Sequence, residues 1–305
     1  EVEDAGRKIA RELVKNGIAK ISEEATIMDF TRQDLGVWVL LRKDGTVLYS
    51  AKDLALARIK FNNYKPDESL VITSVEQNLH FKQLEKTLEL MNFKHWEKYR
   101  HLGYESVRLP EGKMSSRTGS NILYADFRDE LVNEAKKEII KRENISEKDI
   151  VKRAFAIAIA AIKYTMLKQD TNKIIVFDKE EASRFEGYTG PYLLYSYARA
   201  RSILRKAKYK KSYKFELGDI EVKEKKLASI LSSFPSVVEH AYRELAPSVI
   251  AHYTYTLAQT FNEFYHDTKV IGSEEEAFRL ALVDAFSQVL KNALYLLGIP
   301  VLEEM

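Results

Sequence analysis

The sequence predicts an α/β domain followed by an all-α helical bundle. Three observations carry this prediction. Strand-like apolar runs alternate with amphipathic helices before about residue 125. After this residue the pattern is almost entirely helical, and the sequence contains no internal repeat. At 305 residues the chain exceeds the size of one simple core, so we expect more than one domain.

Apolar runs in the first part predict strands at 37–41, 46–50, 70–75 and 105–109. Helical spacing predicts helices at 4–20, 53–61 and 78–91, and Asn16-Gly17 interrupts the first of them. Strands that alternate with helices favour a layered sheet, in which ligands gather beyond the carboxyl ends of the strands.

The second part is patterned as helix after helix. Helices are predicted at 126–142, from a capping-box pattern at 146, from Gly190-Pro191, and at 223–233, 247–266 and 274–297. A short strand-like run at 173–177 interrupts them. The run at 154–162 is apolar on every side and is expected to be buried.

Composition restricts the kind of protein. Apolar residues make up 45% of the chain, yet no apolar run is long enough to span a bilayer and no signal peptide is visible. The absence of cysteine excludes disulfides and thiolate catalysis and fits a cytoplasmic location. Dense charge of both signs resembles thermophile usage. The net charge of +3 means that contacts with nucleic acid would rely on local basic patches.

A loop of sequence GKMSSRTGSN, at 112–121, follows the predicted strand at 105–109. Its glycines let backbone amides approach an anion, Ser115 and Ser116 can donate to phosphate oxygens, and Lys113 and Arg117 add positive charge. The loop therefore suits a polyphosphate. An ordinary exposed turn has the same composition, and the motif alone does not separate the two interpretations.

Two pairs of polar residues follow predicted strands. Tyr49 and Asp53 lie four apart at a predicted strand-to-helix junction, where a carboxylate can accept a guanidinium through two parallel hydrogen bonds. Asp53 is equally well placed to cap the helix. Gln77 and His80 follow the strand at 70–75, where a doubly wound sheet would bind a nucleotide, although such residues also serve as surface or core residues.

The helix after Gly190 is basic and aromatic. One face at helical spacing carries Tyr188, Tyr192, Tyr195 and Arg199, and further basic residues extend it: Arg201, Arg205, Lys206, Lys208, Lys210 and Lys211. Tyrosines interleaved with basic residues suit a folded RNA, through stacking and phosphate contacts. Tyrosines packed inward on a solvated helix are the alternative.

The helix at 247–266 offers a second polar face, made of Tyr255, Gln259, Asn262 and His266. This face could read unstacked bases or simply meet water. The remaining histidines show no metal-ligand spacing, so no metal site is predicted.

Several ordered segments carry a resemblance to a known family. Lys113-Met-Ser-Ser-Arg117 is similar to the KMSKS signature of class I aminoacyl-tRNA synthetases. The chain as a whole resembles arginyl-tRNA synthetases through six segments in order: DGTVLYSAKDLALA, SVEQNLHF, PEGKMSSRTG, FEGYTGPYLLYSYAR, FNEFYHDTKVI and RLALVDAFSQVLKNALYLLGIPVLEEM.

The resemblance implies a division into three parts. Residues 1–125 would be the second half of a Rossmann-type parallel-sheet catalytic domain with its KMSKS-type loop, 126–186 a connecting helical region that contacts the tRNA stem, and 187–305 a helical anticodon-binding domain. The chain departs from the family in having no HIGH-like tetrapeptide. We therefore expect a carboxyl-terminal half that is nearly inactive alone.

The resemblance also implies substrates and roles. Arginine, ATP with Mg²⁺, and the arginine tRNA would be the substrates of a protein with no membrane association and a monomeric state. Lys113, Ser115 and Ser116 would be catalytic, Tyr49, Asp53 and Gln77 would bind arginine, and His80 would bind ATP together with Lys113, Met114 and Ser115. The implied tRNA contacts are Tyr188, Tyr192, Tyr195, Arg199, Tyr255, Gln259, Asn262, Tyr265 and Met305.

Three other interpretations stay open. The chain could be a non-catalytic RNA-binding module, since the helical half is complete while the HIGH-like motif is missing. It could also be a structural bundle with an incidental loop. A class I specificity for cysteine or methionine is disfavoured, because the chain lacks a cysteine-rich zinc site and has a carboxylate placed for a guanidinium.

Overall fold

The computed structural model describes residues 1–110, 123–142, 145–211 and 218–305, which form two compact units, 1–106 and 107–305. The loop residues Lys113, Met114, Ser115 and Ser116 lie outside the described residues.

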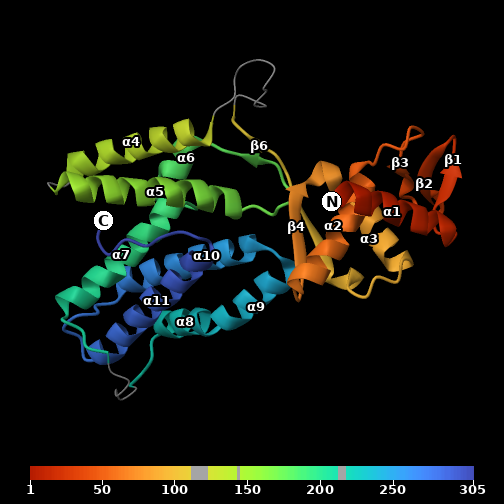
Figure 1. Cartoon of the computed structure of the whole chain (residues 1–305). Helices are drawn as coiled ribbons and strands as arrows, with labels where there is room; N and C mark the ends of the chain where they lie inside the picture. The colour runs from red at the N-terminus through yellow and green to blue at the C-terminus, as the bar shows by residue number, and fades with distance from the viewer. Residues whose placement is uncertain (111–122, 143–144, 212–217) are drawn as a thin grey trace. The chain divides into compact units, whose positions relative to one another are not determined.

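The first unit contains two small sheets among three helices (Figure 1). The elements before the second sheet are α1 (Val2–Lys15), β1 (Lys20–Ser22), β2 (Ala25–Phe30), β3 (Gly36–Leu41) and α2 (Tyr49–Tyr64). β4 (Ser69–Ser74), α3 (Asn78–Leu90) and β5 (Tyr99–Tyr104) follow. Strands β1, β2 and β3 pair antiparallel in that order, whereas β4 and β5 pair parallel, with Ser69 opposite Tyr99.

Helix α2 is held close to α1 and β3, and this fixes where its polar residues lie. A Cβ added to Gly6 on α1 would come 2.8 Å from the carbonyl oxygen of Ala51, so only glycine permits this approach. Arg7 donates to the carbonyl oxygen of Gly45 at 2.7 Å. Ala51 and Leu54 are fully buried on the inner side of α2, which leaves Tyr49 and Asp53 outside the apolar core.

The first unit differs from the sequence prediction in several details, and β1 and β2 were not predicted. The strand predicted at 46–50 is wrong: Val47 forms only an isolated bridge with Leu41, and Tyr49 already begins α2. The strand at 37–41 exists, but it pairs antiparallel with β2. Strand β5 was not predicted, because its sequence YRHLGY lacks an apolar run, and its parallel pairing with β4 is what forms it.

The second unit is a helical bundle with one short pair of parallel strands, β6 (Val107–Arg108) and β7 (Ile175–Val176). Its helices are α4 (Tyr124–Arg142), α5 (Glu147–Leu167), α6 (Lys179–Ser183), α7 (Gly190–Lys206), α8 (Val222–Ser232), α9 (Phe234–Glu244), α10 (Pro247–Asp267) and α11 (Glu276–Leu296). The predicted strands at 105–109 and 173–177 thus shrink to two residues each, and α9 was not predicted.

Helix α7 lies against α5, α10 and α11 in the centre of this bundle, as Figure 1 shows. The alanine-rich run at 154–162 of α5 is buried as predicted, except for Phe155, which is 47% exposed. A partly buried ion cluster ties the start of α8 to α11, since Arg279 donates to Glu224 and to Glu221 at 2.7 Å each. Glu224 is fully buried, and Arg279 gives its carboxylate a bonded partner there.

The start of α7 is fixed by a close approach to α5. Thr189 caps the helix by accepting a hydrogen bond from the amide of Tyr192 at 3.3 Å, and Pro191 occupies the first turn. A Cβ on Gly190 would come 2.1 Å from the carbonyl oxygen of Ala160. Glycine at this position therefore sets the distance between the two helices.

We expect Gly190→Ala to destabilise the second unit by about 3 kcal/mol, because the added methyl group would force α7 away from α5. Gly187→Ala is the matched control: Gly187 has φ of +74° but open space around its Cβ position, so only backbone strain of about 1 kcal/mol is expected. Urea denaturation measures both free energies of unfolding. Equal losses would show that the close approach carries no weight.

Candidate functional site

The first unit joins three side chains from three elements. His80 on α3 and Asp53 on α2 form a hydrogen bond of 2.8 Å between Nε2 and Oδ2. Trp38 on β3 donates its indole N–H to Nδ1 of His80 at 3.3 Å. The Asp53 and His80 side chains are 27% and 24% exposed, so the carboxylate is partly shielded yet open to a ligand.

The capping role considered for Asp53 is not supported. Helix α2 begins at Tyr49, with Leu48 as its N-cap, so Asp53 lies one turn inside the helix, where the amides are already bonded. The structure therefore joins Asp53 to His80 in place of the helix terminus.

Tyr49 and Gln77 do not join this cluster in the described part of the chain. Tyr49 is 80% exposed, and the Lys52 ammonium lies 6.0 Å from its ring centroid. Gln77 is exposed in the short 3₁₀ turn Val75–Gln77 before α3. Both side chains are thus available to a ligand but are not arranged by contacts within this unit.

A second histidine lies behind the first. His101 on β5 stacks on Phe81, with ring centroids 4.1 Å apart, and its Nε2 lies 2.8 Å from the Thr73 hydroxyl. Burial, and then the nearby His80, lower the pKa of His101. His101 was not predicted as a site residue, because the sequence of β5 lacks the pattern of a strand.

In the second unit, a polar network links the facing sides of α7 and α10. The Asn262 amide donates to the Tyr192 hydroxyl and to Ser196 Oγ, each at 2.9 Å. Its carbonyl oxygen accepts from Arg199 at 2.7 Å. Burial raises the pKa of Tyr192, so its hydroxyl remains protonated. Tyr192, Arg199 and Asn262, all predicted to contact RNA, therefore form one connected group.

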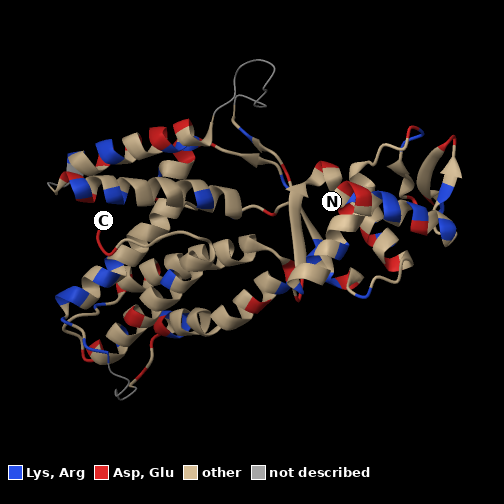
Figure 2. Cartoon of the chain, viewed as in Figure 1, with Lys and Arg blue, Asp and Glu red and all other residues tan. Residues whose placement is uncertain are grey.

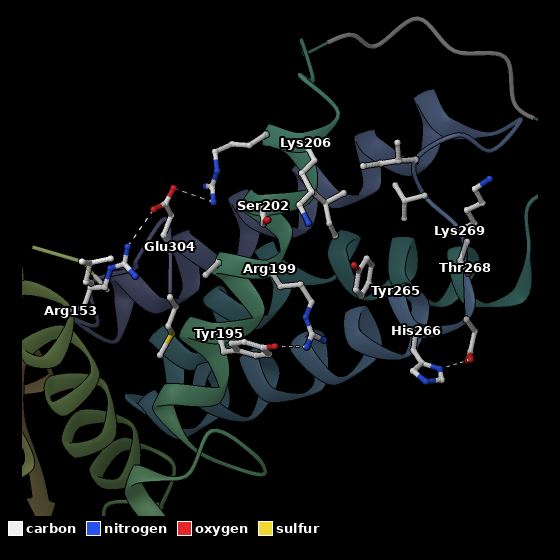
Figure 3. Close-up of a pocket in the computed structure, with 18 residues that line it drawn as sticks. Arg153, Tyr195, Arg199, Ser202, Lys206, Tyr265, His266, Thr268, Lys269 and Glu304 are labelled. Carbon is white, nitrogen blue, oxygen red and sulfur yellow. Dashed lines mark hydrogen bonds and ion pairs between the residues drawn. The ribbon is translucent and has the colours of Figure 1, made fainter. Parts of the chain in front are cut away.

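Arg199 also lies between two aromatic rings, as Figure 3 shows for its bond with Tyr195. The guanidinium carbon is 4.6 Å from the Tyr195 centroid and 5.6 Å from the Tyr265 centroid, and its second nitrogen donates to the Tyr195 hydroxyl at 3.0 Å. Both tyrosines remain 39% exposed. Arg199 thus holds two tyrosine rings that remain partly open to solvent.

Tyr188 and Tyr255 form a neighbouring aromatic pair. Tyr188 precedes α7 and so does not share its helical face as predicted, but its ring meets Tyr255 edge-on at 4.5 Å and its hydroxyl bonds His252. Burial raises the pKa of Tyr188 to about 12. The Tyr255 ring also lies near that of Tyr192, with ring centroids 5.8 Å apart. Gln259, on the same helix α10, is exposed.

A pocket of about 850 Å³ opens beside Tyr195, Arg199 and Tyr265. Basic side chains line it from the helices α5 and α7 and from the loop after α10: Arg153, Arg199, Arg205, Lys206 and Lys269. Figure 2 shows basic residues toward the end of α7. Asp267 and Glu304 are the carboxylates among its lining residues, so positive charge predominates. Arg153 and Lys269 were not singled out from the sequence, because neither shares the tyrosine-bearing helical face.

Met305 lines the same pocket and is held there by the residues before it. Leu302 is buried in the core. Glu303 accepts from Tyr197 at 2.9 Å on one carboxylate oxygen and from Arg201 at 2.8 Å on the other. Partial burial opposes ionisation, but these two donors keep the pKa of Glu303 below its usual value. The segment 302–305 is therefore held by the burial of Leu302, and the two hydrogen bonds to Glu303 fix the direction in which the chain continues to Met305.

Neither a metal nor a membrane site is indicated by the described residues. Among them, no group of three or more His, Asp or Glu side chains is placed to hold a metal ion. No helix in the described ranges combines the length and apolar character needed to cross a membrane.

Comparison with protein families assigns both parts of the chain. Residues 3–178 match the model described as tRNA synthetases class I (R), catalytic domain, and residues 193–305 match the DALR anticodon binding domain. The fold is thus that of a class I aminoacyl-tRNA synthetase: a Rossmann-like catalytic domain followed by a helical DALR domain. This confirms the predicted fold class.

Individual relatives narrow the class. The arginine–tRNA ligase of Bdellovibrio bacteriovorus is 36% identical over 312 residues, covering 100% of this chain and 54% of the relative. That of Clostridium acetobutylicum is 38% identical over 302 residues, covering 97% of this chain and 53% of the relative. The Thermus thermophilus arginyl-tRNA synthetase structure matches with a TM-score of 0.88 at 28% identity, covering 100% of this chain and 59% of that one.

The chain belongs to the arginyl-tRNA synthetase family. The resemblance read from the six sequence segments is confirmed. The chain spans about half the length of the curated relatives it matches.

We expect Glu303→Gln to increase the mobility of the Met305 methyl group while lowering the free energy of unfolding by less than about 1 kcal/mol, since the Glu303 side chain is 54% exposed. The amide offers one acceptor where the carboxylate offers two. Methyl NMR on ¹³C-methionine protein measures this, because the chain has only five methionines.

Glu239→Gln on α9 is the matched control, as it removes one charge and one surface ion pair, with Arg243. Equal Met305 mobility in the two variants would contradict the assigned role of Glu303.

Proposed function

We propose that the protein containing this chain joins arginine to its tRNA through an arginyl-adenylate. The arginine carboxylate attacks the α-phosphorus of ATP and pyrophosphate leaves. A terminal ribose hydroxyl of the tRNA then attacks the adenylate carbonyl and AMP leaves. The observation that carries the proposal is the partly shielded Asp53 carboxylate held by His80 in the catalytic part of an arginyl-tRNA synthetase family member.

Asp53 suits a guanidinium better than an ammonium. A carboxylate can receive two parallel N–H bonds from the planar guanidinium fork, and a lysine ammonium cannot reproduce them. Exposed Tyr49 and Gln77 would complete the arginine pocket once a ligand is bound. The resemblance implies that His80 contacts the adenosine of ATP. Its hydrogen bond with Asp53 instead supports a position of His80 beside the bound arginine.

Residues outside the described ranges would serve the nucleotide. We assign Lys113 to neutralising charge as pyrophosphate departs, and Ser115 and Ser116 to holding the loop or its phosphates, with Met114 beside them. Mg²⁺ would arrive with ATP, because the described residues offer no cluster for a resident ion.

The second unit would hold the tRNA. The exposed rings of Tyr195 and Tyr265 can stack on unpaired bases, and the basic pocket beside them can take phosphates. Tyr188, Tyr192, Tyr255 and Asn262 would support this surface from behind, and Met305 lines the pocket. Gln259, exposed on α10, would contact the RNA as well. Residues 187–305 would bind the anticodon region, 126–186 the stem, and 1–125 the amino acid and ATP.

An RNA-binding role without catalysis is the alternative. It is favoured by one observation: the tyrosine and arginine network is complete within the second unit.

Because the chain spans about half the length of its relatives, we propose that residues 1–305 alone bind tRNA but do not catalyse the reaction. We place the protein in the cytoplasm as a monomer.

Asp53→Asn in the whole enzyme should raise the arginine KM by roughly 10²-fold, because the amide offers one acceptor and no charge to the guanidinium. The ATP KM should change little. Steady-state pyrophosphate exchange measures both constants.

Asp67→Asn, at an exposed loop position between α2 and β4, is the matched control and should leave both constants unchanged. If Asp53→Asn shifts the arginine and ATP constants equally, Asp53 does not bind the guanidinium.

A further inference from the structure

The hydrogen-bond directions around His80 fix the position of its proton. An indole N–H can only donate, so the Trp38 contact of 3.3 Å requires Nδ1 of His80 to be an acceptor without hydrogen. The hydrogen of the neutral ring must then be on Nε2. Nε2 lies 2.8 Å from Asp53 Oδ2, so His80 donates to the carboxylate.

The His80 ring is also held sterically. Trp38 and Phe81 meet it edge-on, with ring centroids at 5.3 Å and 5.1 Å. Trp38 is only 6% exposed and belongs to the core of the first unit. In this series of hydrogen bonds, the first donor, Trp38, is therefore rigid. The last acceptor, Asp53, faces the proposed ligand.

We propose that Trp38 and His80 are positioning residues for arginine recognition, which hold the plane of the Asp53 carboxylate for the guanidinium fork. The proposal rests on the function assigned to Asp53 above. Each carboxylate oxygen has two lone pairs, so after His80 takes one on Oδ2, a second on Oδ2 and one on Oδ1 remain for two parallel ligand bonds.

Loss of the indole N–H would release this arrangement. His80 could then carry its hydrogen on Nδ1 and turn an Nε2 lone pair toward Oδ2, and the two acceptors repel. Rotation of the carboxylate breaks a two-bond fork but costs a point-like ammonium little. Trp38 therefore contributes to the preference for arginine over lysine without touching either.

The first test observes the tautomer directly. In ¹⁵N-histidine NMR spectra of this chain, His80 should show a protonated Nε2 and an unprotonated Nδ1, and Trp38→Phe should populate both tautomers. Trp96→Phe, which changes the other tryptophan, is the control and should leave His80 unaltered. A single unchanged tautomer in Trp38→Phe overturns the inference.

An isosteric replacement guards against misfolding of Trp38→Phe. Incorporating benzothienylalanine for tryptophan in the Trp96→Phe background exchanges the Trp38 N–H for sulfur and keeps the ring volume. The same mixture of tautomers is expected. Retention of the Nε2–H form alone would again overturn the proposal.

The second test is a double-mutant cycle in the whole enzyme. Trp38→Phe should raise the arginine KM roughly 5- to 10-fold with kcat and the ATP KM nearly unchanged, the scale of one weakened hydrogen bond. In His80→Gln, whose amide N–H needs no tautomer control, adding Trp38→Phe should cost less than twofold more. A merely structural tryptophan would give equal losses in both backgrounds, which would overturn the positioning role.

The outcomes separate this inference from the proposed function. If Asp53→Asn raises the arginine KM while Trp38→Phe does not, the positioning role fails and the function of Asp53 stands. If Asp53→Asn leaves the arginine KM unchanged, the proposed function fails and the inference fails with it.

Discussion

The organisation of the helical unit depends on the bonding of Asn262. Its amide uses both hydrogens, on Tyr192 and Ser196, and its carbonyl oxygen receives Arg199, so one side chain joins α7 to α10 through three bonds. Arg199 in turn orients Tyr195 and Tyr265. Because half-buried polar groups are costly unless satisfied, this network permits one arrangement of the helices and one orientation of the exposed rings. The surface proposed to bind RNA is thus a consequence of how the helices satisfy the polar groups between them.

The two units present opposite charge to their proposed partners, and each fixes its charged group in the same way. In the first unit a carboxylate, Asp53, is held by a histidine that a tryptophan orients. In the second, a guanidinium, Arg199, is held by an asparagine and two rings. In both cases a partly exposed ion is held by several side chains of its own unit. Such preorganisation lowers the entropy lost when a ligand binds.

Much of the fold followed from the sequence, and the failures have physical causes. Helix α5 was predicted from a capping-box pattern and an apolar run, and α7 from Gly190-Pro191 at its start. The strand predicted at 46–50 does not form, because Val47 makes a single bridge with Leu41 and α2 already begins at Tyr49. In the site, Asp53 and His80 were selected singly, but their bond and the role of Trp38 were not. Trp38 and His80 are 42 positions apart, and only the tertiary structure shows that they meet.

The binding of RNA by this chain is the most direct test of the anticodon-binding role proposed for the second unit. The measurement compares the affinity of residues 1–305 for an anticodon stem–loop of arginine tRNA with that for the same stem closed by a short loop that lacks the anticodon. We expect the intact loop to bind at least about tenfold more tightly at a fixed salt concentration, because stacking of one base on an aromatic ring contributes about this much affinity. Equal affinities would contradict it, since phosphate contacts alone would then explain the binding.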